Sequence, residues 1–178
     1  MNKSKQKNIV YILLFITISI FYIFNDFIYK YETDPEDIQG VEVKEDNAYK
    51  VIKVIDGDTL ELESIGKVRL IGVDTPETVD PRKEVECFGK EASEYTKTIL
   101  LNNYITIEYD NTQDKEDKYG RDLVYIFKDN INFNLELIQK GYAYEYTYKV
   151  PYKYQREFKD AQTKAKETKQ GIWGDICN

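Results

Sequence analysis

Residues 51–73 read VIKVIDGDTLELESIGKVRLIGV, and this stretch decides the fold. Apolar and polar residues alternate in 51–55, 59–62 and 68–73, which is the pattern of half-buried β-strands. The tripeptides DGD and SIG separate these segments, and Asp, Ser and Gly favour turns. We therefore predict three short consecutive strands.

A helix is predicted over residues 90–101 (KEASEYTKTILL), after the third strand. Ala92, Tyr95 and Ile99 fall on one helical face, with Thr96 near the edge of that face. The dipeptide Asn-Asn that follows residue 101 ends the helical pattern.

The rest of the chain supplies two strands and two helices. Residues 105–109 and 123–127 alternate between apolar and polar on either side of the charged loop 110–122. Helices are expected over about 133–140 and 152–169, and a glycine follows each of them as a stop.

Three strands, a helix, two strands and two helices follow one another in the order of the OB fold. We therefore predict an α+β domain over residues 49–178. It would be a five-stranded, partly open barrel with one helix between strands three and four and two C-terminal helices. An N-terminal transmembrane helix would precede it.

The N-terminal region has the composition of a membrane segment. Residues 8–25 carry no charged side chain, lysines precede them and acidic residues follow them. We predict a transmembrane signal-anchor over 9–29, a basic cytoplasmic tail over 1–8 and an acidic tether over 30–48. A cleaved signal peptide, which would release a secreted protein, is the alternative, although no alanine precedes Ala48 to supply a cleavage site. We thus expect the folded domain outside the cell membrane, held to the lipid bilayer by its anchor.

The charge distribution restricts how the chain could act on nucleic acid. The formal net charge is -7, which argues against a protein that coats nucleic acid through an excess of Lys and Arg. Seven acids against one lysine give residues 31–48 a net of -6, so residues 49–178 carry only -4. Any phosphate chemistry must therefore be local. The chain has no histidine, so a catalytic base must be a carboxylate, a tyrosine or a lysine.

Two acids and two arginines have the chemistry that phosphodiester hydrolysis needs. Paired carboxylates such as Asp58 and Asp74 suit a hard cation, and planar guanidinium groups suit phosphoryl oxygens. Only four of the 25 basic residues are arginines, and Arg69 and Arg121 are two of them. Arg69 and Asp74 are five positions apart and would face opposite sides of a regular strand, so we expect a bend at Gly72. Taken singly, each of these residues could instead have a structural role, because the acids could cap a turn and the arginines could pair with surface acids.

Five motifs together resemble the staphylococcal nuclease, or thermonuclease, family. They are VIDGDTL (54–60), RLIGVDTPE (69–77), FGKEAS (88–93), DKYGR (117–121) and GIW (171–173), in the order and spacing of that family. The resemblance covers roughly residues 50–174 and implies an OB-fold nuclease that uses calcium.

The resemblance also implies a role for particular residues. Asp58, Asp74 and the backbone carbonyl of Thr75 would bind the calcium ion. Arg69 and Arg121 would hold the scissile phosphate, and Glu77 would be the general base that acts on the attacking water. The residues implied to line the nucleotide pocket are Lys118, Tyr119, Tyr146 and Tyr148.

Three functions are weighed on this basis. The first is a calcium-dependent endonuclease, a monomeric enzyme that hydrolyses DNA and RNA outside the cell membrane and, by the resemblance, leaves 3'-phosphates. The second is a catalytically silent OB-fold module that binds nucleic acid or protein. The third is an extracytoplasmic adaptor without metal dependence. The catalytic and metal-binding positions are all present, which favours the enzyme.

Cys87 and Cys177 are the only cysteines, and the domain that carries them is expected in an oxidising compartment. We expect one disulfide that fixes the C-terminal tail to the loop before the first helix. On the loop-entropy model it would contribute roughly 4–5 kcal/mol. Two free thiols are the alternative.

Overall fold

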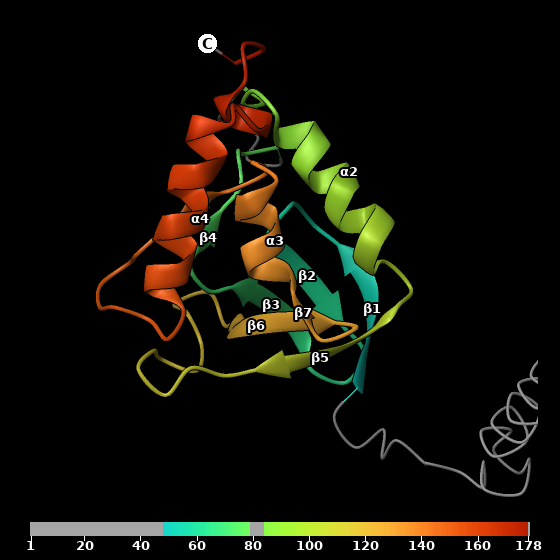
Figure 1. Cartoon of the computed structure of the whole chain (residues 1–178). Coiled ribbons are helices and arrows are strands. Elements are labelled where there is room, and N and C mark those ends of the chain that lie inside the picture. The colour runs from blue at the N-terminus through green and yellow to red at the C-terminus, as the bar shows by residue number, and fades with distance from the viewer. Residues whose placement is uncertain (1–47, 79–83, 178) are drawn as a thin grey trace, which may run out of the picture. The chain divides into compact units, whose positions relative to one another are not determined.

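The computed structural model describes residues 48–78 and 84–177, which contain a closed five-stranded barrel (Figure 1). Neighbouring strands pair antiparallel in the order β3-β2-β1-β5-β6. A parallel pairing of β3 with β6, in which Val68 lies opposite Asp122, closes the ring. The strands are β1 (Ala48–Val54), β2 (Thr59–Leu62), β3 (Gly66–Leu70), β5 (Tyr104–Glu108) and β6 (Asp122–Lys128). The predicted OB-type barrel is thus present, and it is closed instead of partly open.

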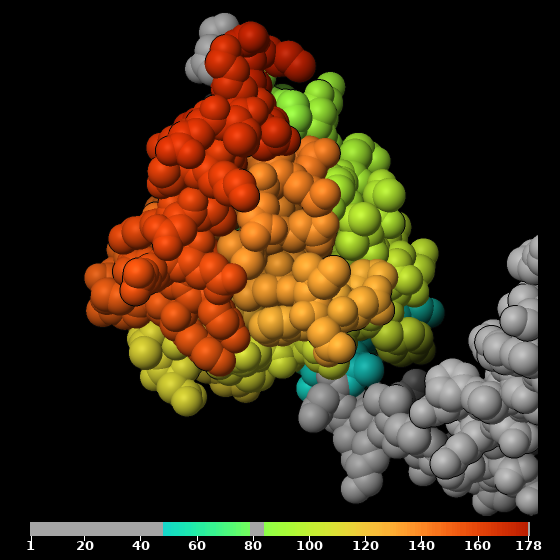
Figure 2. All heavy atoms as spheres, viewed as in Figure 1, coloured from blue at the N-terminus to red at the C-terminus, as the bar shows by residue number. Residues whose placement is uncertain are grey.

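Three α-helices and one short 3-10 helix accompany the barrel. The helices are α2 (Gly89–Leu100), α3 (Phe133–Gln139), α4 (Gln155–Glu167) and η2 (Gly171–Trp173). Helix α2 connects the third barrel strand to the fourth, as predicted, and α3 and α4 follow the last barrel strand. On the face shown in Figure 2, α4, α3 and α2 form one continuous surface.

The core combines aliphatic residues from every barrel strand with aromatic residues from β6 and the two C-terminal helices. Its largest fully buried side chains include Tyr125, Phe133 and Phe158. One buried polar residue fixes α3 to the barrel. The Asn134 side chain donates to the carbonyls of Ile71 and Val124 and accepts from the backbone N–H of Ile126. This amide therefore joins the end of β3 to β6.

The strand predicted over 68–73 bends at Gly72, as expected. Strand β3 ends at Leu70, Gly72 has a φ of 77°, and β4 (Val73–Asp74) begins after it. A Cβ atom at Gly72 would lie 2.6 Å from the ring of Tyr152, so both the backbone angle and the packing require glycine. Strand β4 pairs with β8 (Tyr144–Glu145), which places Asp74 opposite Tyr144.

Some predicted details were wrong. Strands β4, β8 and β7 (Ile131–Asn132) were not expected, because two residues are too few to give a periodic pattern. The last helix begins at Gln155 instead of 152, since Tyr152 is buried beside Gly72 before the helix starts. Thr96 lies at the centre of the buried face of α2 and not near its edge, because its hydroxyl donates to the carbonyl of Gly57 at 2.8 Å.

Within residues 48–78 and 84–177, no helix has both the length and the apolar character needed to cross a membrane. The predicted tail (1–8), anchor (9–29) and nearly all of the tether (30–48) lie outside these residues.

Candidate active site

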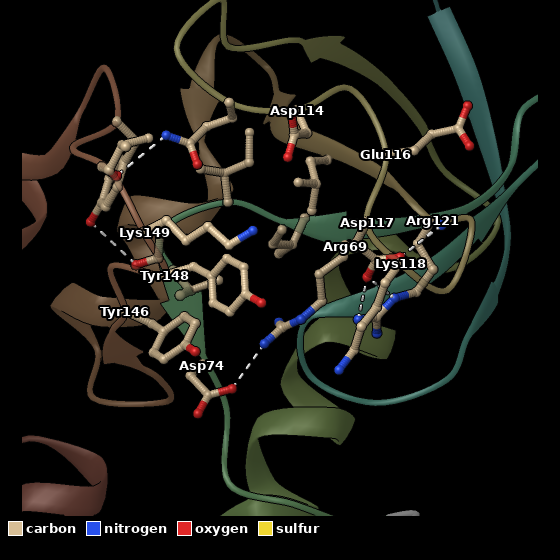
Figure 3. A pocket seen from close by; sticks show the side chains of 18 of the residues that line it. Arg69, Asp74, Asp114, Glu116, Asp117, Lys118, Arg121, Tyr146, Tyr148 and Lys149 are labelled. Carbon is tan, nitrogen blue, oxygen red and sulfur yellow. Dashed lines mark hydrogen bonds and ion pairs between the residues drawn. The ribbon is translucent and has the colours of Figure 1, made fainter.

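An open cleft with a volume of about 860 Å³ lies where β3 ends and β4 begins (Figure 3). The loop that leads into β6 and the loop that follows β8 form its other walls. Predicted site residues that line the cleft are Arg69, Asp74, Lys118, Tyr119, Arg121, Tyr146 and Tyr148. The fold thus brings together seven residues from three separate segments of the sequence, 69–74, 118–121 and 146–148.

Asp58 lies in the turn between β1 and β2 and does not itself line the cleft. Its side chain is only 6% exposed. One carboxylate oxygen accepts the backbone N–H of Thr75 at 2.8 Å and the other accepts the hydroxyl of Thr59 at 3.2 Å. A Cβ atom at Gly57 would lie 2.7 Å from the Thr75 side chain, so only glycine lets the turn approach this closely. Asp58 and Thr75, both implied metal ligands, are therefore joined directly.

Arg69 connects the two carboxylates that the resemblance assigns to the metal. Its guanidinium forms an ion pair with Asp58 and a second one, Nη2 to Oδ1 at 2.8 Å, with Asp74. Burial alone would lower the pKa of Arg69, but the charges of Asp58, Asp74 and Asp56 outweigh burial and raise it. Arg69, Asp58 and Asp74 are called the arginine–carboxylate centre below.

Burial also raises the pKa of two acids near Arg69, Asp74 and Asp56. The pKa of Asp74 is raised mainly by burial, against the effect of Arg69, and the charges of Asp58 and Glu86 add to the increase. Burial and the charge of Asp58 raise the pKa of Asp56 to about 7. Near neutral pH the turn at 56–58 therefore carries less negative charge than its sequence indicates. The sequence analysis assigned no role to Asp56.

The donor set around Arg69 fits a hard divalent cation. Asp58 and Asp74 both pair with the Arg69 guanidinium, so their carboxylates are directed at one position, which a positive charge occupies. Among the described residues, no three or more acidic, His or Cys side chains gather at a single point. A cation held by Asp58 and Asp74 would complete its shell with backbone carbonyls such as that of Thr75, water and substrate oxygens, all of which calcium accepts.

Arg121 is oriented by an acid within its own motif. Its Nε donates to Asp117 at 2.7 Å, its Nη2 lies 2.6 Å from the same carboxylate, and its Nη1 donates to Thr59. Burial opposes ionisation of Asp117, but hydrogen bonds from Arg121 and Tyr119 lower its pKa. Asp117 was not predicted as a site residue, although its position four residues before Arg121 favours such a pair.

The outer part of the cleft is lined by exposed aromatic residues. Tyr119 and Tyr148 are 71% and 66% exposed, and the Tyr146 and Tyr148 rings lie 6.4 Å apart. Lys118 lies 4.9 Å from the centre of the Tyr119 ring, and contact with Tyr119 and the nearness of Tyr148 raise its pKa. These four residues, Lys118, Tyr119, Tyr146 and Tyr148, are called the aromatic rim. Their exposed rings can stack with nucleobases.

Glu77, the expected general base, does not line the cleft, although Asp74, three residues before it, does. Its carboxylate accepts the backbone N–H of Thr78 at 2.8 Å. Its own N–H donates to the carboxylate of Glu86 at 3.0 Å.

The two cysteines, Cys87 and Cys177, form a disulfide, as expected.

A closed OB-type barrel whose cleft combines arginines, carboxylates and exposed tyrosines defines a class of proteins that act on nucleic-acid phosphodiesters. The family model for staphylococcal nuclease homologues matches residues 67–175. The thermonuclease of Staphylococcus hyicus is 42% identical over 147 residues, which are 81% of this chain and 86% of the relative. The thermonuclease of Staphylococcus intermedius is 42% identical over 129 residues, which are 71% of this chain and 76% of the relative.

A third relative, the SPbeta prophage-derived endonuclease YokF of Bacillus subtilis, is 34% identical over 125 residues, 68% of this chain and 42% of the relative. The chain therefore belongs to the staphylococcal nuclease homologue family. It is a nuclease, a hydrolase whose substrate is nucleic acid, which decides against the silent binding module and the adaptor.

Proposed function

We propose that this nuclease hydrolyses phosphodiester bonds of both DNA and RNA with the help of calcium, outside the cell membrane, and leaves 3'-phosphates. The observation that carries the proposal is that Asp58 and Asp74 both pair with the guanidinium of Arg69. Arg69 lines a cleft that Arg121 also lines. The type of product and the use of calcium come from the family resemblance.

Asp58, Asp74 and the backbone carbonyl of Thr75 are the residues that would hold the calcium ion. When bound, the ion neutralises negative charge on the phosphoryl oxygens and makes a coordinated water more acidic. The buried hydrogen bond from Thr75 to Asp58 keeps two of these ligands in a fixed relation before any substrate arrives.

The role proposed for Arg69 requires an exchange of partners. The guanidinium now pairs with Asp58 and Asp74, and it would turn to the scissile phosphate once another cation neutralises these acids. Arg121 would keep its present partners, because its bonds to Asp117 and Thr59 already orient its guanidinium. Together the two guanidinium groups would stabilise the charge that develops on the phosphoryl oxygens.

Glu77 is proposed to remove the proton from the attacking water, since the chain has no histidine and Asp58 and Asp74 serve as ligands. Its carboxylate would have to turn from the Thr78 N–H toward the cleft for this step. Lys118 would contact a phosphate, and the tyrosines of the aromatic rim would stack with bases. Stacking depends on the base faces and not on the 2'-hydroxyl, which supports action on both DNA and RNA.

The location is proposed from the sequence and from the disulfide. Residues 9–29 would anchor a monomeric enzyme in the bilayer, with the domain outside. A disulfide between Cys87 and Cys177 suits an extracytoplasmic compartment, because the cytosol keeps thiols reduced. Cleavage of the leader, which would release the enzyme, is the alternative. Protease added to intact cells should remove the nuclease domain if the anchored arrangement is correct, and full protection would contradict it.

Digestion of labelled single-stranded DNA and RNA by the full-length protein tests the proposed chemistry. We expect cleavage of both in calcium, none after chelation with EGTA, and products with 3'-phosphate ends. Arg121→Ala should slow cleavage by about 10³-fold, as for removal of an arginine that stabilises a phosphoryl transition state. Arg156→Ala is the matched control, because Arg156 is exposed and does not line the cleft. Equal rates in calcium and EGTA, or an Arg121→Ala variant as active as wild type, would overturn the proposal.

A further inference from the structure

The C-terminal tail and the segment before α2 meet at one end of the domain (Figure 1). Cys87 immediately follows Glu86 and precedes the start of α2, and Cys177 lies beyond η2. The Cys87–Cys177 disulfide therefore ties the C-terminal tail to the segment before α2, directly beside Glu86, which bonds to the backbone of Glu77.

Two hydrogen bonds join Glu86 to the backbone of Glu77. The backbone N–H of Glu77 donates to the Glu86 carboxylate at 3.0 Å, and the backbone N–H of Glu86 donates to the carbonyl of Glu77 at 2.9 Å. The first residue of α2 adds a steric limit. A Cβ atom at Gly89 would lie 2.9 Å from the carbonyl of Pro76 and 3.1 Å from that of Glu77. The backbone of Glu77 is thus enclosed between Glu86 and the start of α2.

The C-terminal side of the disulfide is itself fixed to the domain. Ile172 is 4% exposed, and its N–H donates to the carbonyl of Gly141 at 2.9 Å. Gly141 and Gly171 approach so closely that a Cβ atom on either would lie within 2.2 Å of the other segment. Cys177 follows this turn by only a few residues, so the disulfide connects Cys87 to a tail that begins at a fixed point of the domain.

We propose that Glu86 and the Cys87–Cys177 disulfide are positioning elements for Glu77, an inference that rests on the role of general base proposed for Glu77. The disulfide holds Glu86 in place, and Glu86 fixes the backbone from which the Glu77 side chain reaches the water. A misplacement of about 1 Å at a reacting group can reduce the rate about 10²-fold. Loss of either element should therefore lower kcat and leave KM nearly unchanged, since neither element lines the cleft.

Steady-state kinetics of the full-length protein in calcium test the Glu86 contact. Glu86→Ala should lower kcat about tenfold or more, with KM within about twofold, because placement of the base is what changes. Glu86→Gln should retain most of the activity, since its amide oxygen can still accept the N–H of Glu77. Glu84→Ala is the matched control, an exposed acid two residues away. Wild-type kcat in Glu86→Ala, or equal losses in the Ala and Gln variants, would overturn the inference.

The double variant Cys87→Ser, Cys177→Ser tests the disulfide, measured below the temperature at which it begins to unfold. It should lower kcat in the wild-type background and have no further effect in Glu77→Gln, where the positioned base is already gone. An equal factor in both backgrounds would show a purely structural role and contradict the proposal. If Glu77→Gln alone keeps wild-type activity, the base assignment fails. If Glu77→Gln is inactive while the cysteine and Glu86→Ala variants are fully active, only the positioning inference fails.

Discussion

Asp58 and Arg69 in the arginine–carboxylate centre have side chains that are 6% and 15% exposed, whereas Tyr119 and Tyr148 in the aromatic rim are 71% and 66% exposed. The centre is connected to the turn after β1, to β3 and to β4 by hydrogen bonds and ion pairs. The rim residues lie on loops, where Lys118 lies over the Tyr119 ring and the Tyr146 and Tyr148 rings are neighbours. The difference indicates that the side chains of the centre are already held around one position before substrate binds, whereas the exposed rings of the rim can adapt.

The largest stability effect is expected in the centre, for Asp58→Ala. The change leaves Arg69 buried with one of its two charge partners gone and the Thr75 N–H without its acceptor. We expect a loss of about 3 kcal/mol in the free energy of unfolding. Asp74→Ala removes the other partner, but the Asp74 side chain is 52% exposed, so we expect a loss of about 1 kcal/mol or less. Urea unfolding followed by the fluorescence of the single tryptophan measures both. Equal losses would contradict the description of the centre.

The second-largest effect on stability is expected at Asp110, an acid that supports the loops beneath the rim. Asp110 accepts the Tyr125 hydroxyl, the Lys153 N–H and two hydrogen bonds from Thr112. Burial alone would raise the pKa of Asp110, but these hydrogen bonds lower it below the ordinary value near 4. The stabilisation is therefore complete above that value and is lost as pH falls toward the lower folded pKa.

Asp110→Asn should cost about 1.5 to 3 kcal/mol at pH 7, the usual contribution of hydrogen bonds to a charged group. Its free energy of unfolding should also fall less steeply than that of wild type when pH drops below about 4. Unfolding in urea at a series of pH values between 7 and 2 compares the two proteins. Parallel curves would show that the Asp110 carboxylate does not have a lowered pKa.

The smallest effect is expected in the rim. Tyr148→Ala removes one stacking surface, which is worth about 1 to 3 kcal/mol of binding to single-stranded nucleic acid. KM should therefore rise roughly tenfold with kcat unchanged, and the free energy of unfolding should stay within about 0.5 kcal/mol of wild type. Tyr104→Ala is the matched control, because Tyr104 is 60% exposed on β5 and does not line the cleft. A fall in kcat for Tyr148→Ala would mean that the rim also positions the phosphate.

Features with a local pattern could be predicted from the sequence. The alternation in residues 51–55, 59–62 and 68–70, the bend at Gly72 and the glycine after α3 depend on near neighbours in the chain. The predicted stop at Gly171 was wrong, because α4 ends at Glu167 and Gly171 is the first residue of η2. The motif residues Arg69, Asp74 and Arg121 could be chosen because their order and spacing carry the family resemblance, and the structure places all three in one cleft.

Features that depend on contacts between distant segments could not be predicted. Closure of the barrel needs the parallel pairing of Val68 with Asp122, and no local sequence pattern predicts this pairing. The double ion pair of Arg69 and the burial of Thr96 against Gly57 likewise depend on the assembled fold. Glu77 was expected in the cleft but does not line it in this structure, where its N–H bonds to the Glu86 carboxylate nine residues away.

The most direct test of the central claim is a single-turnover measurement with Glu77→Gln in calcium, on a labelled single-stranded DNA. We predict that cleavage slows by about 10²- to 10⁴-fold, the usual contribution of a general base, while the affinity for DNA stays within about twofold of wild type. Glu63→Gln, which changes an exposed acid in the turn after β2, should cleave at the wild-type rate. Cleavage by Glu77→Gln at the wild-type rate would contradict the account.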